Sequence, residues 1–190
     1  MGCKQCDREV LQEKFGIKFK PVSQTERTKD ESTLRFKQKG DKKKVKEELL
    51  RKFKQEIQNH GRIITETEFN EKIGEDLLNK YKQKPYISDD YEENLETLLE
   101  PGPVELNNGS LYNGTWNSNG KMDGYGQFYA ESNNEKIYIN GLWDNGDIKG
   151  GKIITADNTY EGEIKNGQYN GNGMMKYENG MEYTGTFKDG

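Results

Sequence analysis

The sequence predicts an α+β protein organised by segment: a disordered N-terminus, short helices, then an elongated all-β ribbon of stacked β-hairpins. Three observations predict this order. Residues 1–40 are polar and aperiodic, with no apolar pattern that could form a core. Apolar residues recur at helical spacing in the segment 41–103. Sixteen of the 22 glycines lie in the segment 104–190, where aromatic residues alternate with polar ones.

The composition limits both the core and the compartment. Of the 190 residues, 30% are hydrophobic and 33% are charged, so we do not expect one core over the whole chain. No apolar run approaches the roughly 20 residues that span a bilayer, and charges from Lys4 onward argue against a secretory leader. Both cysteines lie within the first six residues, which is typical of a cytoplasmic protein rather than a disulfide-stapled one.

The first six residues are typical of an acylation signal. Gly2 is available for N-myristoylation after removal of Met1, and Cys3 and Cys6 offer thiols for palmitate, although Ser or Thr is preferred at position six. One acyl chain holds a protein only marginally at a bilayer, so a second signal is needed. Alternatively, the cysteines are unmodified, or Cys-x-x-Cys is half of a metal or redox site. A zinc site needs four ligands, and His60 is the only other candidate, so we predict no metal.

A basic patch supplies a further membrane signal. Residues 1–62 carry 18 Lys and Arg against 10 Asp and Glu, while 63–103 and 104–190 are acidic. Each basic residue near a surface attracts anionic lipid by about 1 kcal/mol. The patch opens a helix at 42–58, which we expect to pack on its neighbours or on a partner. The alternatives are a membrane-surface helix and a calmodulin-type target. The patch consists of Lys42, Lys43, Lys44 and Lys46.

Three helices are predicted in the segment 41–103. The first carries an apolar stripe at four-residue steps: Val45, Leu49, Phe53 and Ile57. Thr65-Glu-Thr-Glu68 is a capping box before a second stripe: Phe69, Ile73, Leu77 and Tyr81. Ser88-Asp89-Asp90 caps the third helix, which reaches Leu98 and Leu99 and is ended by Pro101-Gly102-Pro103.

The segment 104–190 repeats one pattern, a bulky residue, a glycine two positions later and a second bulky residue two further on. The four glycines are 27, 21 and 23 residues apart, which indicates a stacked repeat. Alternate residues share one face of a strand, and a glycine between them indicates a close neighbour, such as an aromatic from the next repeat. The four copies are Tyr112-Asn-Gly114-Thr-Trp116, Ile139-Asn-Gly141-Leu-Trp143, Tyr160-Glu-Gly162-Glu-Ile164 and Tyr183-Thr-Gly185-Thr-Phe187.

Turn residues predict how the hairpins close. Asn108-Gly109 and Asn179-Gly180 indicate two-residue hairpin loops, and Asp157-Asn158 plays the same role. A longer polar loop is expected at Glu131–Glu135. Because one hairpin cannot bury its apolar face, the units are expected to stack. The array stops at Gly190, before the glycine pair that follows in the earlier copies, so we expect the chain to be truncated at its C-terminal end.

These segments resemble the MORN (membrane occupation and recognition nexus) repeat, about 23 residues built on Tyr-x-Gly-x-(Trp/Phe)-x-x-Gly-x-x-x-Gly-x-Gly. The resemblance covers residues 104–190. It departs from the pattern at Ile139 and Ile164, by one extra residue before Gly120, and at the adjacent glycines 150–151. It implies a twisted ribbon that serves as a scaffold or dimerising surface, often at membranes or in ciliary or cytoskeletal assemblies. In some relatives the repeats adjoin a lipid-kinase or methyltransferase domain.

From these features we expect a non-enzymatic adaptor without a cofactor, peripheral to the cytoplasmic face of a membrane. Its partners would be proteins, through the ribbon and the helices. With one histidine there is no Ser/His/Asp or Cys/His constellation, and the Gly-x-Gly pairs lack the context of a phosphate loop. The aromatics are expected to form the core, with an exposed ligand strip as the alternative. An acidic ribbon does not favour nucleic acid. The alternatives are a structural subunit of a ciliary or cytoskeletal complex, and the N-terminal part of an enzyme whose catalytic domain lies beyond residue 190.

Overall fold

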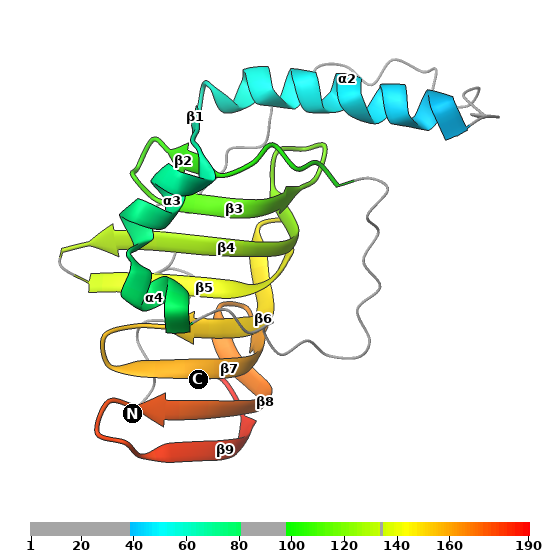
Figure 1. Cartoon of the computed structure of the whole chain (residues 1–190). Coiled ribbons are helices and arrows are strands. Elements are labelled where there is room, and N and C mark those ends of the chain that lie inside the picture. Colours follow the sequence, from blue (N-terminus) through cyan, green and yellow to red (C-terminus); the bar gives the residue numbers. More distant parts are fainter. Residues whose placement is uncertain (1–38, 81–97, 134) are drawn as a thin grey trace.

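The computed structural model describes residues 39–80, 98–133 and 135–190, and it confirms the predicted ribbon of stacked hairpins. The strands form one antiparallel nine-stranded sheet in sequential order, so each strand pairs with its neighbours along the chain (Figure 1). The elements are α2 (Lys39–Ile57), β1 (Gly61–Ile63), α3 (Glu66–Ile73), α4 (Glu75–Lys80), β2 (Val104–Leu106), β3 (Leu111–Trp116), β4 (Met122–Ser132), β5 (Glu135–Asp144), β6 (Asp147–Ile154), β7 (Asn158–Lys165), β8 (Gln168–Tyr177) and β9 (Glu182–Phe187).

Register places residues of one kind in continuous rows across the sheet. Directly paired residues of antiparallel strands point to the same face, so each row belongs to one face. One row, the aromatic row, is apolar from β3 to β9: Tyr112, Phe128, Ile139, Ile153, Tyr160, Met175 and Tyr183. The neighbouring row on the opposite face, the covered row, changes from apolar to polar: Leu111, Tyr129, Tyr138, Ile154, Thr159, Lys176 and Glu182.

Helix α2 closes the β1 end of the aromatic face. Phe53 and Ile57 are each 4% exposed, and the Phe53 ring lies 5.5 Å from that of Trp116. The stripe predicted for this helix is only half used, because Val45 and Leu49 remain 38% and 41% exposed. Figure 1 shows the reason: the N-terminal half of α2 extends past the end of the strands, where no sheet lies beneath it.

Helices α3 and α4 cover the other face, over the apolar part of the covered row. Phe69 and Ile73 pack there with Leu111, Tyr129 and Tyr138. The predicted cap is present, since Thr65 Oγ1 accepts a hydrogen bond from the Glu68 amide at 3.1 Å. The second stripe does not form one helix, however. Gly74 has φ +88° and separates α3 from α4, so the two helices can follow the curved sheet.

The third predicted helix does not reach Leu99. Leu99 instead forms an isolated antiparallel bridge with Trp116, with amide-to-carbonyl distances of 2.7 and 2.9 Å in the two directions. The bridge satisfies the backbone of Trp116 beyond the end of β2, which pairs only with the first residues of β3. The remainder of that predicted helix, like the second stripe's Tyr81, lies within 81–97 and outside the described residues.

The hairpin turns differ from the prediction in a regular way. Asn108-Gly109 and Asn179-Gly180 end three-residue loops, in which glycine alone takes a positive φ, of 82° and 83°. Asn145-Gly146 and Asn166-Gly167 instead form two-residue loops, in which both residues have positive φ. The expected long loop at Glu131–Glu135 is largely strand, because β4 and β5 remain paired up to Ser132 and Glu135. The first interval is long because these strands are long.

An ion-pair network joins α3 to the sheet. Glu105 on β2 accepts hydrogen bonds from Lys72 on α3, at 2.7 Å, and from Arg62 on β1. Arg62 also pairs with Glu68. The Lys72 ammonium, followed by the Arg62 guanidinium, holds the pKa of the Glu105 carboxyl below its ordinary value of 4.5.

We therefore expect the charge on Glu105 to stabilise the fold fully above about pH 4.5, its ordinary pKa, and progressively less as the pH falls further. Glu105→Gln should lower the free energy of unfolding at pH 7 by about 1 kcal/mol. A carboxyl whose pKa is depressed by folding loses its stabilising effect as the pH falls. The difference from the wild type should therefore shrink as the pH is lowered below 4.5, in urea unfolding followed by tryptophan fluorescence. Glu178→Gln, at an exposed turn, is the control. A difference independent of pH would contradict the role of the charge.

Candidate interaction surfaces

A tyrosine folded over glycine is the repeated unit of the ribbon. The hydroxyls of Tyr112, Tyr160 and Tyr183 each donate to the carbonyl three residues ahead, at 3.1, 2.7 and 3.2 Å. This bond lays the ring along its own strand, over the glycine two residues on. A Cβ added at Gly173 would lie 2.6 Å from Tyr160 Oη, and one at Gly185 would lie 2.6 Å from Tyr183 Oη. Any side chain there would displace the ring.

The glycines beneath these rings form one unbroken row. Each strand from β3 to β9 contributes one glycine, paired in register with the next. The approach is too close for a side chain even without tyrosine, since a Cβ at Gly162 would lie 2.6 Å from Gly173 Cα. This glycine row is Gly114, Gly126, Gly141, Gly151, Gly162, Gly173 and Gly185.

The second copy of the pattern solves the same problem without tyrosine. Ile139 has no hydroxyl to fold its side chain over Gly141. The Ile148 side chain occupies that space instead, with Cδ1 2.9 Å from where a Cβ of Gly141 would lie. The register shifts between Leu142 and Trp143, which pair with Gly150 and Ile148. The adjacent glycines 150–151 thus accompany a β-bulge that brings Ile148 into position.

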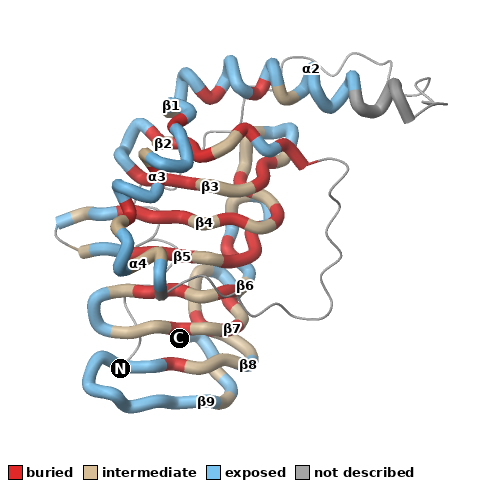
Figure 2. The backbone as a smooth tube through the Cα atoms, viewed as in Figure 1, coloured by how far each residue is buried: buried red, intermediate tan, exposed pale blue. Residues whose placement is uncertain are grey.

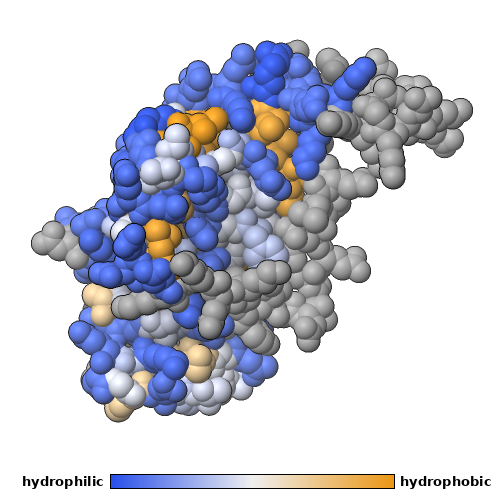
Figure 3. Space-filling view, viewed as in Figure 1, coloured by the Kyte–Doolittle hydropathy of each residue, from blue (hydrophilic) through white to orange (hydrophobic). Residues whose placement is uncertain are grey.

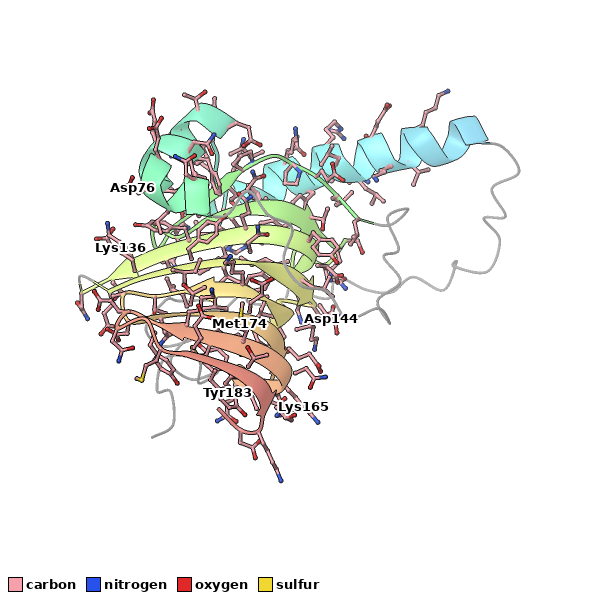
Figure 4. All side chains as sticks on the ribbon, turned by 60° about the horizontal axis from the view of Figure 1, so that its bottom comes forward. Asp76, Lys136, Asp144, Lys165, Met174 and Tyr183 are labelled. Carbon is pink, nitrogen blue, oxygen red and sulfur yellow. The ribbon has the colours of Figure 1, made fainter. Side chains whose placement is uncertain are left out.

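The second bulky residue of the pattern packs against a tyrosine, either the tyrosine of the preceding copy or that of its own copy. Trp143 packs edge-on against Tyr112 at 5.8 Å, and Phe187 packs edge-on against Tyr160 at 5.1 Å. Tyr112, Trp116 and Tyr160 are fully buried, so these aromatics are core and not a ligand strip. Tyr183 differs, because 47% of it is exposed at the β9 end of the ribbon (Figure 4).

This fold and geometry define a β-hairpin repeat protein, in which bulky side chains of one strand fill the space over the glycine of the neighbouring strand. The MORN repeat family model matches residues 112–134 and 160–182, which are the β3–β4 and β7–β8 hairpins. The chain therefore contains two MORN repeats. The copies that begin at Ile139 and Tyr183 keep the same register outside the matched segments. The search of curated proteins found no match.

The membrane-directed prediction falls mostly outside the described structure. Gly2, Cys3 and Cys6 lie in the segment 1–38, which is not described. Lys42 and Lys43 lie in α2, although their side chains are not described, and Lys44 and Lys46 are exposed on the same helix. The patch therefore begins on the part of α2 that extends past the sheet (Figure 1). None of the described helices has the length and apolar character needed to cross a membrane.

A second surface was not anticipated from the sequence. It is the part of the face bearing the covered row that lies beyond α4 and has no helix over it. Here the covered row becomes polar, and the adjacent row continues with Glu161, Met174 and Thr184. Figure 2 shows burial decreasing from β6 to β9, and Figure 3 shows this part of the molecule as largely hydrophilic. We call it the open face: Thr159, Glu161, Met174, Lys176, Glu182 and Thr184. Along each strand these residues alternate with residues of the aromatic row, and this alternation is the signal in the sequence that could have located the open face.

An open pocket of about 660 Å³ lies beside α4. Its lining includes the exposed Asp76 and Lys136 (labelled in Figure 4) and the buried Tyr138 and Ile154. Across the described residues, no three His, Cys, Asp or Glu side chains are grouped to hold a metal. His60 lies exposed in the turn after α2, where its carbonyl accepts the Asn107 amide at 2.9 Å.

The glycine row gives a direct prediction. Gly173→Ala should lower the free energy of unfolding by about 1–3 kcal/mol, because its Cβ would meet the Tyr160 ring. Asn172→Ala, the exposed adjacent residue, is the matched control and should have a small effect. Chemical denaturation of both variants measures the difference. Equal stability of the two would show that the ring does not fill the glycine gap.

Proposed function

We propose that this protein is a non-enzymatic scaffold that holds other proteins together at the cytoplasmic face of a membrane. The observation that carries the assembly role is that the two faces of the sheet are used differently. The aromatic and glycine rows are used for packing between rungs, whereas the open face of β7–β9 presents polar side chains on a rigid backbone. A regular surface of this kind, built on paired strands, suits docking of partner proteins.

The membrane role is supported by the sequence and by the position of α2. Gly2 with Cys3 and Cys6 would supply acyl chains, and Lys42, Lys43, Lys44 and Lys46 would supply attraction to anionic lipid. Because the patch lies on the part of α2 beyond the sheet, it could meet a bilayer while the open face stays available. Two weak signals would then act together.

Flotation on liposomes tests the membrane role. Protein co-expressed with acyltransferases should float with anionic vesicles, and Gly2→Ala should remove most of the floating fraction. Cys3→Ser with Cys6→Ser should reduce flotation if palmitate adds the second chain, and Lys44→Glu with Lys46→Glu should reduce it at low salt only. Equal flotation of the wild type and all three variants would rule out the anchor.

Affinity capture tests the assembly role separately. Thr159→Arg with Thr184→Arg places two large charges on the open face without touching the core. Proteins retained by the wild type should be lost by this variant. They should be kept by Thr67→Arg with Ser118→Arg, which changes exposed residues elsewhere. An identical set of proteins on all three baits would show that the open face is not the docking surface.

A further inference from the structure

The pocket beside α4 lies where the helical cover of the sheet ends. Figure 1 shows α4 over β5 and β6, with the strands β7 to β9 beyond it. The pocket volume of about 660 Å³ falls within the range of roughly 300–1,000 Å³ that is usual for ligand pockets. Much of the lining is apolar, so an occupant with apolar side chains would gain by leaving water. The apolar lining residues are Ile73, Leu77, Tyr138 and Ile154.

The charged residues of the lining leave an excess of negative charge. The Lys136 ammonium lies 3.8 Å from the Glu131 carboxylate and is thus already paired. Glu75 and Asp76 also line the pocket, and both are exposed without an ion pair to any described residue. The pocket therefore suits an occupant that combines apolar side chains with positive charge.

One segment of the chain itself has this composition. Residues 14–20 read Lys-Phe-Gly-Ile-Lys-Phe-Lys, with no acidic residue among them, and lie outside the described residues. In an extended segment, alternate side chains share one side. Phe15, Ile17 and Phe19 would then point together into a pocket. The lysines would alternate with them, and their long side chains can reach carboxylates at the edge of the pocket.

The chain is long enough for this segment to reach the pocket. The 18 residues 21–38 separate it from the start of α2, and an extended chain of that length spans up to about 60 Å. Helix α2 has 19 residues and is about 28 Å long, and the spacing of the strands from β2 to β6 adds about 19 Å. A tether of this kind also keeps the segment at a high effective concentration.

We propose that residues 14–20 dock in the pocket beside α4, with their apolar side chains inside it and their lysines directed at Glu75 and Asp76. Docking shortens the link between Gly2 and the sheet. The link runs over residues 3–38 without docking and over residues 3–13 with it, so its greatest length falls from about 120 Å to about 40 Å. Under the proposed membrane attachment, the open face is then held near the bilayer. This consequence rests on the proposed function, whereas the docking itself does not.

Disulfide trapping in the full chain tests the docking. Gly16→Cys with Ala156→Cys places one thiol in the segment and one at the pocket, in a chain that also carries Cys3→Ser and Cys6→Ser. Gly16 lies between Phe15 and Ile17, so the apolar side chains stay in place. The disulfide within one chain should form at least about tenfold faster than for Gly16→Cys with Ser118→Cys, whose second thiol lies in an exposed turn outside the pocket. Mass spectrometry of the unreduced protein measures both rates.

Changes in the segment show whether its apolar side chains hold it in the pocket. In the chain with cysteines at 16 and 156, Phe15→Ala with Phe19→Ala should slow trapping to the rate measured with the cysteine at 118. Leu34→Ala with Phe36→Ala is the matched control, because it removes two apolar side chains from the same N-terminal region, and it should leave the rate unchanged. Equal rates at positions 156 and 118, or a rate unaffected by the change at Phe15 and Phe19, would overturn the proposal.

Changes at the pocket show whether its charge selects the segment. Glu75→Lys with Asp76→Lys should slow trapping at least about tenfold, whereas Glu178→Lys, at an exposed turn, should not change it. Disulfides formed between two chains in place of the disulfide within one chain would overturn the docking, because the occupant would then be another copy. Flotation is scored separately on the chain with its native cysteines. Flotation without trapping contradicts the docking alone, and trapping without flotation contradicts the membrane anchor alone.

Discussion

The structure depends on the contact between a tyrosine ring and a pair of facing glycines. The facing glycines leave a gap on one face of the sheet, and a sheet with a side chain at every position would have no such gap. An aromatic side chain normally stands away from its strand, but here the hydroxyl bond to the carbonyl three residues ahead lays the ring down. The ring then fills the volume left by two missing side chains. Glycine loses conformational entropy in a strand, so each must be offset by packing of this kind.

Stability is therefore spread over the individual hairpins and their contacts with neighbouring hairpins, and it is not concentrated in one central core. Tyr112 and Tyr160 are each covered by an aromatic residue of a later hairpin, so the loss of one hairpin exposes the tyrosine of another. The second copy shows how far the chemistry can vary. Ile139 lacks the hydroxyl, and Ile148 together with a bulge restores the filled gap. What is required is the filled volume, and tyrosine is one means of filling it.

The sequence predicted the ribbon well because its signals are local and repeated. Spacing of glycine between bulky residues located the strands that carry the pattern, and the stripe of α2 located its helix. The turns were predicted less well, since Asn-Gly occurs both at the end of three-residue loops and as the whole of two-residue loops, and the asparagine takes a positive φ only in the latter. Leu99 was misassigned because its pairing with Trp116 depends on where β2 ends, which no local pattern encodes. The open face was missed for a similar reason, because which part of the covered row lies under a helix is a matter of tertiary contact.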